Sequence, residues 1–148
     1  MMKKIFVIAL LIIVVIAGIF YVNQVKETKS IANFKLEAKT VALEYEAAIK
    51  ENPLNYEFVN DYIVGKTAYA FILDEDFNLI MHPIEGLLGK SMFGLISSEL
   101  DDTLINLSIE IPEAFIRYKW QNKEKMIFFH KASDGTILGI SAGSIKGY

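Results

Sequence analysis

Three patterns of hydrophobic and polar positions follow one another along the chain. Residues 5–22 form an uninterrupted apolar run, preceded by Lys3 and Lys4. Residues 24–51 place apolar positions alternately three and four apart, with no glycine or proline among them. From residue 68 onward, short runs rich in β-branched and aromatic residues are separated by turn residues. These patterns predict, in order, a membrane helix, an amphipathic helix and a set of strands.

The first run predicts a membrane anchor over residues 1–22. About 18 residues at ~1.5 Å each reach near 27 Å, enough for the hydrocarbon layer of a bilayer. The two lysines favour a cytoplasmic amino terminus, which places everything after the anchor outside the cytoplasm. A cleaved signal peptide is the alternative, because Val15 and Ala17 suit a cleavage site, but the run stays apolar through Val22. We therefore expect an uncleaved single-pass anchor at the cell membrane, followed by an extracytoplasmic domain over residues 23–148.

The second pattern predicts one helix over residues 24–51. It ends at Asn52-Pro53, because the residue before a proline disfavours the α region. Leu36 and Leu43 supplement the apolar seam of this helix. We expect the seam to cover a sheet, with a homodimer contact as the alternative. The seam consists of Ile31, Phe34, Ala38, Val41, Tyr45 and Ala48.

The remaining runs predict five strands, together with a turn over residues 56–64 and a short helix near residues 92–100. Two helices, two strands, an irregular crossover and three meandering strands are typical of an α+β fold. We predict a membrane helix running into a long helix that packs on a five-stranded antiparallel sheet, with the helices on one face. The strands are expected at residues 68–73, 79–82, 114–120, 124–131 and 136–143.

The last three strands also carry a predicted register. If Asn122-Lys123 and Asp134-Gly135 form two-residue turns, the pairing of both hairpins is fixed. One face then suits packing under the long helix, and the other has the composition of a ligand floor. The first face holds Ile116, Tyr118, Ile127, Phe129, Ile140 and Ala142. The second holds Phe115, Arg117, Lys119, Met126, Phe128, His130, Gly139 and Ser141.

Residues 69–83 contain a strand ending in Asp74, an acidic turn, and a second strand ending in His82-Pro83, with Gly89-Lys90 following. This segment resembles the Cache extracytoplasmic sensor domains, as do residues 115–120 and the closing glycine-rich strand. Phe77 stands where the family usually has glycine. The resemblance implies a PAS-like five-stranded sheet that binds a small molecule outside the cell. Members usually continue into a second membrane helix and an output domain, so we expect this chain to pass its signal to a separate partner.

The amino-acid composition argues against several classes of function. All 18 acidic residues follow the anchor, which leaves the domain a net charge of −5 and makes nucleic acid an unsuitable partner. Without cysteine the chain has no disulfide, thiol catalyst or thiolate metal site. No catalytic set accompanies the carboxylates or serines, and His82 is interpreted as a hydrogen-bonded structural residue. We expect neither enzyme activity nor a metal or cofactor.

Arg117 is the only arginine among 15 basic residues. Since lysine serves for solubility elsewhere, an arginine within a strand indicates that its planar guanidinium is used. We expect Arg117 to hold the carboxylate of a small ligand, an organic acid or an amino acid; a rim cation is the alternative. Tyr69 and Phe71, on the first strand, complete the wall because that strand neighbours the last one in a PAS-like sheet. The expected ligand-binding residues are therefore Arg117, Phe115, Phe128, His130, Ser141, Tyr69 and Phe71.

These observations favour a membrane-anchored sensory module that binds a small molecule and passes the signal on. A structural, pilin-like or surface subunit without ligand is the alternative, because a hydrophobic amino-terminal helix running into an amphipathic helix and a sheet is also the layout of pilins. Against it, the apolar run contains no glutamate and no glycine-bounded peptidase site precedes it.

Overall fold

The computed structural model describes residues 2–52, 56, 68–109 and 111–143, with side chains from residue 12 onward except at 108 and 109. The turn expected over residues 56–64 therefore lies outside the described residues, apart from Tyr56. The elements are α1 (Met2–Glu51), β1 (Ala68–Leu73), β2 (Leu79–Met81), the 3-10 helix η2 (Glu85–Leu87), α2 (Ser98–Ile109), β3 (Glu113–Trp120), β4 (Lys123–Lys131) and β5 (Ile137–Ala142).

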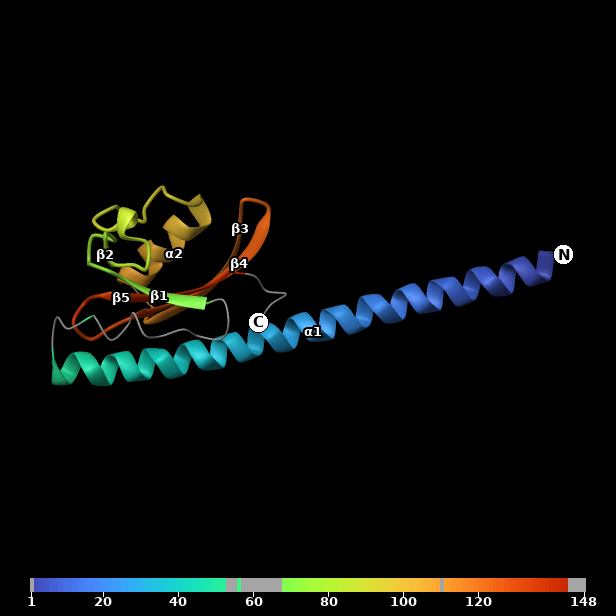
Figure 1. Ribbon diagram of the computed structural model, residues 1–148, viewed down its shortest axis with the longest axis horizontal. Helices are drawn as coiled ribbons and strands as arrows, with labels where there is room; N and C mark the ends of the chain where they lie inside the picture. The colour runs from blue at the N-terminus through green and yellow to red at the C-terminus, as the bar shows by residue number, and fades with distance from the viewer. Residues whose placement is uncertain (1, 53–55, 57–67, 110, 144–148) are drawn as a thin grey trace.

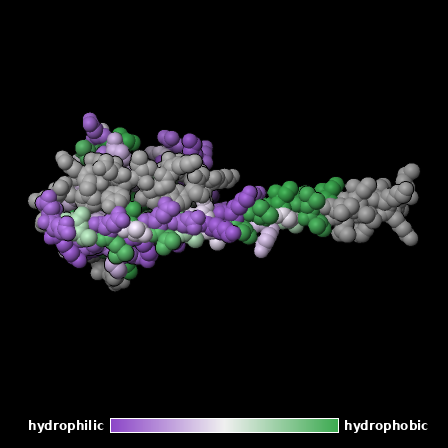
Figure 2. All heavy atoms as spheres, turned by 60° about the horizontal axis from the view of Figure 1, so that its bottom comes forward, coloured by the Kyte–Doolittle hydropathy of each residue, from purple (hydrophilic) through white to green (hydrophobic). Residues whose placement is uncertain are grey.

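α1 is one continuous helix whose two halves have different surroundings. Its carboxyl half lies along the sheet, and its amino half extends well beyond the rest of the molecule (Figure 1). The large apolar side chains between Ile12 and Val22 are exposed. They form the green stretch of the projecting helix in Figure 2, next to the end that is drawn in grey. Residues 5–11 of the expected anchor lie outside those whose side chains are described. Among the residues that are, no helix is long and apolar enough to cross a membrane.

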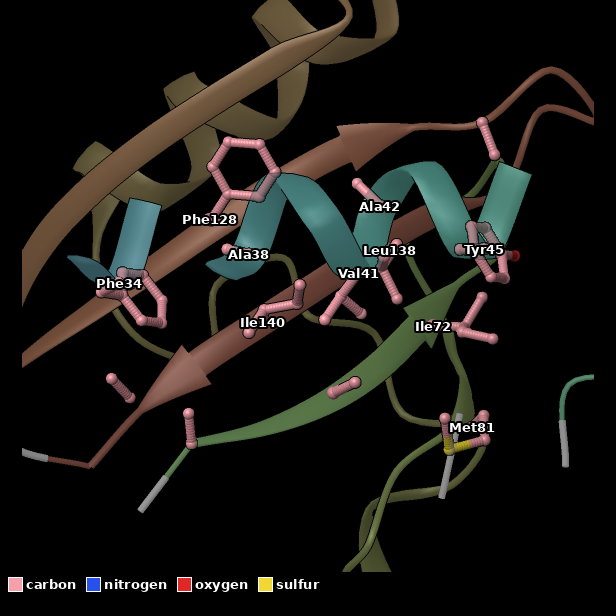
Figure 3. Close-up of a cluster of buried hydrophobic side chains, with 14 of the residues drawn as sticks. Phe34, Ala38, Val41, Ala42, Tyr45, Ile72, Met81, Phe128, Leu138 and Ile140 are labelled. Atoms are coloured by element: carbon pink, nitrogen blue, oxygen red, sulfur yellow. The ribbon is translucent and has the colours of Figure 1, made fainter. Parts of the chain in front are cut away.

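The carboxyl half of α1 covers the sheet through the predicted seam. Phe34, Ala38, Val41 and Tyr45 are buried among side chains of β1, β4 and β5, whereas Leu36 and Leu43 face away and are 69% and 70% exposed. Figure 3 shows these α1 side chains directed at Ile72, Phe128, Leu138 and Ile140. The seam therefore covers a sheet, as expected. Burying one apolar stripe in this way is what holds an amphipathic helix in place.

Hydrogen bonds fix the carboxyl end of α1 to the β4–β5 turn. The Tyr45 hydroxyl lies 2.6 Å from Thr136 Oγ1, which in turn donates to Asp134 Oδ1 at 2.6 Å. Burial raises the pKa of the Tyr45 phenol well above its usual value, so the hydroxyl stays protonated and can donate to Thr136. The next residue, Glu46, accepts hydrogen bonds from the backbone N–H and the hydroxyl of Ser133, at 2.9 and 2.8 Å. Tyr45 and Glu46, which are consecutive in α1, therefore both bond to the segment that connects β4 and β5.

The five strands form an antiparallel sheet in the order β2-β1-β5-β4-β3. The predicted adjacency of the first and last strands is confirmed, because β1 pairs with β5 along its whole length. The expectation that the helices share one face is wrong. α1 covers one face, while α2 and the crossover from β2 cover the other (Figure 1), so both faces of the sheet are buried in two separate apolar clusters.

Both predicted hairpin registers are wrong, for different reasons. The β3–β4 turn is Gln121-Asn122, because both residues adopt positive φ, 50° and 63°, as a two-residue hairpin turn requires. This moves the pairing by two residues and keeps the predicted grouping of β3 and β4 side chains. The expected cover is reversed, because α1 packs on the face of Phe115 and Phe128, and the face of Ile116 and Tyr118 lies under α2 and the crossover. Residues 132–136 lie between β4 and β5, with the Ala132 N–H bonded to the Thr136 carbonyl at 2.8 Å and Gly135 at φ 92°, and the pairing moves by one residue. That shift of one residue turns every β5 side chain to the opposite face.

The short helix of the crossover also lies later than predicted, at Ser98–Ile109 rather than residues 92–100. Gly94, at φ 71°, cannot belong to a right-handed helix. Ser97 begins the helix, since its Oγ accepts a hydrogen bond from the Leu100 N–H at 3.3 Å. Leu100, Leu104 and Leu107 then form the buried stripe that faces the sheet.

Candidate ligand-binding site

A cavity of about 180 Å³ lies between the sheet and the crossover, on the face opposite to α1. Its floor comes from the strands and its roof from the segment between β2 and α2. The floor residues are Tyr69, Phe71, Leu79, Tyr118, Trp120, Lys125, Ile127 and Ser141. The roof residues are His82, Ile84, Leu87, Met92, Leu95 and Ile96. The lining is mainly apolar and aromatic with a few polar groups, which is the usual composition of a small-molecule site.

Three rings build one end of the cavity. The His82 ring meets Tyr69 edge-on at 5.3 Å between centroids and lies 5.9 Å from Phe71. Phe71 lies directly over Gly139 of the neighbouring strand, where a Cβ would collide with the ring. Because residue 139 has no side chain, the Phe71 ring sits close to the sheet and leaves the space above it open.

Two hydroxyl groups lie in the middle of the floor. Ser141 is 1% exposed, and its Oγ is buried without a hydrogen-bond partner among the described residues. The Tyr118 hydroxyl is its neighbour, although no hydrogen bond of normal geometry joins them. Burial raises the pKa of the Tyr118 phenol, and the Ser141 hydroxyl opposes that rise. The two hydroxyl groups therefore lie next to each other on the cavity floor, where a buried polar group is normally hydrogen-bonded.

His82 is held in one neutral form. Its Nδ1 accepts a hydrogen bond from the backbone N–H of Ile84 at 3.0 Å, which leaves the ring proton on Nε2. Burial also lowers the pKa of His82 below its ordinary value of 6.5. The structural role expected for this histidine is thus present, and the same ring lines the cavity.

Lys125 supplies the cavity with a positive charge. It pairs with Tyr118 across the β3–β4 hairpin, so the ammonium side chain belongs to the same part of the floor as the two hydroxyls. No salt bridge joins Lys125 to a carboxylate within the described part of the chain, and no aspartate or glutamate lines the cavity. A lysine, hydroxyl groups and the His82 ring therefore line a space to which the described residues contribute no acidic group, which suits an anion.

The fold was compared with known proteins. A periplasmic sensor domain of a chemotaxis protein is 15% identical and has a TM-score of 0.54, with 78% of this chain and 92% of that chain covered. A methyl-accepting chemotaxis protein from Vibrio parahaemolyticus is 18% identical with a TM-score of 0.58, over 78% and 91% of the two chains. A Cache chemosensory domain described for its recognition of carboxylic acids is 13% identical with a TM-score of 0.54, over 82% and 95%.

The chain has the fold of a Cache-type sensor domain. The resemblance inferred from residues 69–90 is confirmed at the level of the fold. Comparisons with protein-family models and with curated proteins found no match.

The expected ligand residues are divided between the two faces of the sheet. Tyr69, Phe71 and Ser141 line the cavity. The others, Phe115, Arg117, Phe128 and His130, lie on the face covered by α1. The division follows from the one-residue shift at the β4–β5 loop, because Ser141 pairs with Ile127 rather than lying beside Phe128. Grouping all seven on one floor was therefore wrong.

Arg117 uses its guanidinium, but toward protein carboxylates. Its Nη2 donates to Glu27 Oε1 of α1 at 2.6 Å and lies 3.5 Å from Glu124 Oε2 of β4. The other three residues contact α1. Phe115 packs on Phe34 at 6.2 Å between centroids, with the Lys35 ammonium 4.0 Å from the ring centroid, and Phe128 is buried in the same cluster.

His130 also faces α1, with Nε2 3.2 Å from Glu46 Oε1. Partial burial raises the pKa of Glu46, but the hydrogen bonds from Ser133 and His130 outweigh it and lower the pKa below its usual value. The polar groups on this face therefore serve to dock the helix.

Tyr118, Trp120 and Lys125 line the cavity but are not among the ligand-binding residues expected from the sequence. Alternation along β3 and β4 already places Tyr118 on the face of Ile127, opposite to Arg117. What the sequence lacks is a signal for which face the long helix covers, because both faces of these strands are apolar enough to be buried.

Proposed function

We propose that this Cache-type domain is an extracytoplasmic sensory module that binds a small carboxylate and passes the signal to a partner. The fold supports a sensor, since the similar structures include sensor domains of chemotaxis proteins. The similar Cache domain described for carboxylic acid recognition is consistent with the ligand class. Tyr69, Phe71 and Ser141 keep the ligand-binding role expected for them, and Lys125 takes the role expected of Arg117.

One observation carries the ligand class. Among the described residues the buried Ser141 hydroxyl has no hydrogen-bond partner, and those that line its cavity include a lysine and no acidic side chain. A carboxylate accepts hydrogen bonds from hydroxyl and imidazole N–H donors and pairs with an ammonium group. An ammonium group of a ligand would find no carboxylate in this lining, which favours an organic acid over an amino acid.

The test is a thermal-shift screen of short organic acids, amino acids, amines and sugars, followed by calorimetric titration of the hits. A charge-assisted contact shielded from water contributes about 1.5–3 kcal/mol. Lys125→Gln should therefore weaken binding about ten- to 150-fold. Lys123→Gln is the matched control, because Lys123 lies on the same strand, is exposed and does not line the cavity. Hits among amines or neutral sugars, or equal affinities for both variants, would contradict the proposal.

We also propose that residues 1–22 anchor the domain in the cell membrane, with residues 23–148 outside the cytoplasm. The support is the apolar run after Lys3 and Lys4 and the exposure of its described part, Ile12 to Val22. The intact protein should fractionate with membranes, and protease treatment of spheroplasts should remove residues 23–148. A soluble product that begins near Gly18 would show instead that the segment is cleaved.

A further inference from the structure

The β3–β4 hairpin carries the ligand cavity on one face and the contact with α1 on the other. Tyr118, Trp120 and Lys125 line the cavity from the half of the hairpin nearest its turn. Arg117, the residue before Tyr118, points to the opposite face and bonds to Glu27. In the sheet formed by the described strands β3 is an edge strand paired only with β4, so this half of the hairpin depends on its contacts with the two layers beside it.

The Arg117–Glu27 ion pair lies where α1 leaves the body of the domain. Ser30 is the last buried α1 side chain toward the amino terminus, and the described side chains from residue 26 back to residue 12 are exposed. Among the described contacts between α1 and the sheet, this pair is the one nearest the amino end of the helix. It therefore joins the turn end of the hairpin to the point where the projecting half of α1 begins.

Closure of the cavity would move this half of the hairpin away from α1. The crossover and α1 lie on opposite faces of the sheet (Figure 1), so a ligand that draws Lys125 and Trp120 toward the crossover also draws Arg117 from Glu27. Arg117 would not be left unpaired, because Glu124 of the same hairpin lies 3.5 Å away. We propose that the Arg117–Glu27 ion pair holds the hairpin open, so that ligand closure and release of α1 at Glu27 are coupled. The coupling to ligand rests on the proposed function; the restraint of the hairpin does not.

The restraint is tested without ligand by hydrogen exchange on the full chain in detergent. Glu27→Gln should speed exchange of the backbone amides of residues 117–126 by at least about two-fold, the change expected from losing one half-exposed ion pair. The matched control is Lys39→Gln. Lys39 forms a 2.7 Å ion pair between α1 and Glu113, at the end of β3 far from the turn. Unchanged exchange in Glu27→Gln, or equal changes in both variants, would overturn the inference.

The coupling is tested with propionate as the probe. If closure must break the ion pair, Glu27→Gln should bind propionate about two- to five-fold more tightly than the parent, whereas Lys39→Gln should bind like the parent. Equal or weaker binding by Glu27→Gln would overturn the coupling. If propionate and the other short acids fail to bind the parent, the proposed ligand class fails, and the exchange measurement alone decides whether the ion pair restrains the hairpin.

Discussion

Phe77 has the left-handed backbone conformation that glycine adopts most easily, with φ 62°. It lies in the turn between β1 and β2, where Asp74 Oδ1 accepts hydrogen bonds from the backbone N–H groups of Asp76 and Asn78. The turn therefore forms with a bulky side chain in a backbone conformation that favours glycine. Contact with the Phe93 ring, 5.6 Å away between centroids, accounts for part of the compensation.

Two substitutions separate the backbone strain at this residue from the side-chain contact. Phe77→Ala and Phe77→Gly both remove the ring, but only glycine relieves the left-handed conformation. We expect the glycine variant to be more stable than the alanine variant by about 1 kcal/mol, measured by urea unfolding. If alanine equals glycine, the conformation at residue 77 is not strained.

His82 should make stability depend on pH. Its pKa is lowered in the folded protein, so folding favours the neutral ring. The resulting stability is present above the unfolded-state pKa near 6.5 and is lost as the pH falls through that value toward the folded-state pKa. His82→Asn keeps an acceptor for the Ile84 N–H but does not titrate. The free energy of unfolding should therefore fall less between pH 7.5 and 5.5 in this variant than in the parent. Parallel curves would show that His82 contributes nothing.

A residue type that occurs once in a sequence can indicate that its side chain makes a specific contact, but it does not show what the partner is. Arg117 differs from the lysines as a residue, and its guanidinium does have partners, but a single nitrogen, Nη2, contacts both Glu27 and Glu124. The sequence does not show the partners, because Glu27 is 90 residues away on another element. Lys125 could not be distinguished in the same way, because nothing local separates it from Lys123.

At the scale of elements, the two sides of α1 should differ sharply in their tolerance of truncation. Phe34 is fully buried against the sheet, and Phe34→Ala should lower the free energy of unfolding by about 3–5 kcal/mol through lost burial and the cavity left behind. Leu36→Ala, two residues away and exposed in the monomer, should change it by less than about 0.5 kcal/mol. Chemical denaturation of both variants measures the difference. A large loss for Leu36→Ala would mean that this face is covered, as the homodimer alternative requires.

The existence and order of the elements could be predicted from the sequence far better than their pairing. Alternation and turn residues located all five strands to within one or two residues. The registers depend on which turn residues adopt positive φ, and Gln121 carries no such signal. The helix α2 was misplaced because Gly94, which lies within the predicted span, has a positive φ of 71°, and the helix begins only after Ser97.

For the whole molecule, the two apolar clusters predict one cooperative unit. α1 closes one face of the sheet and α2 the other, so neither layer has a core of its own. Residues 23–148, without residues 1–22, should therefore unfold in a single transition. Trp120 fluorescence reports on the β3–β4 hairpin and far-UV circular dichroism reports mainly on the helices, and their midpoints should coincide. Two separate midpoints would mean that α1 is not docked on the sheet.

Because α1 is one uninterrupted helix, a small rotation of its docked half moves its amino-terminal end over a larger distance. Its docked half is fixed at the carboxyl end by Tyr45 and Glu46, and its projecting part, residues 2–26, forms an arm of about 37 Å at 1.5 Å per residue. No proline interrupts the helix, so the arm has no hinge of the commonest kind. A tilt of about 3° at the domain would displace the far end by about 2 Å for an arm of this length. A change too small to disturb the core can therefore arrive at the amino terminus as a movement the size of a side chain.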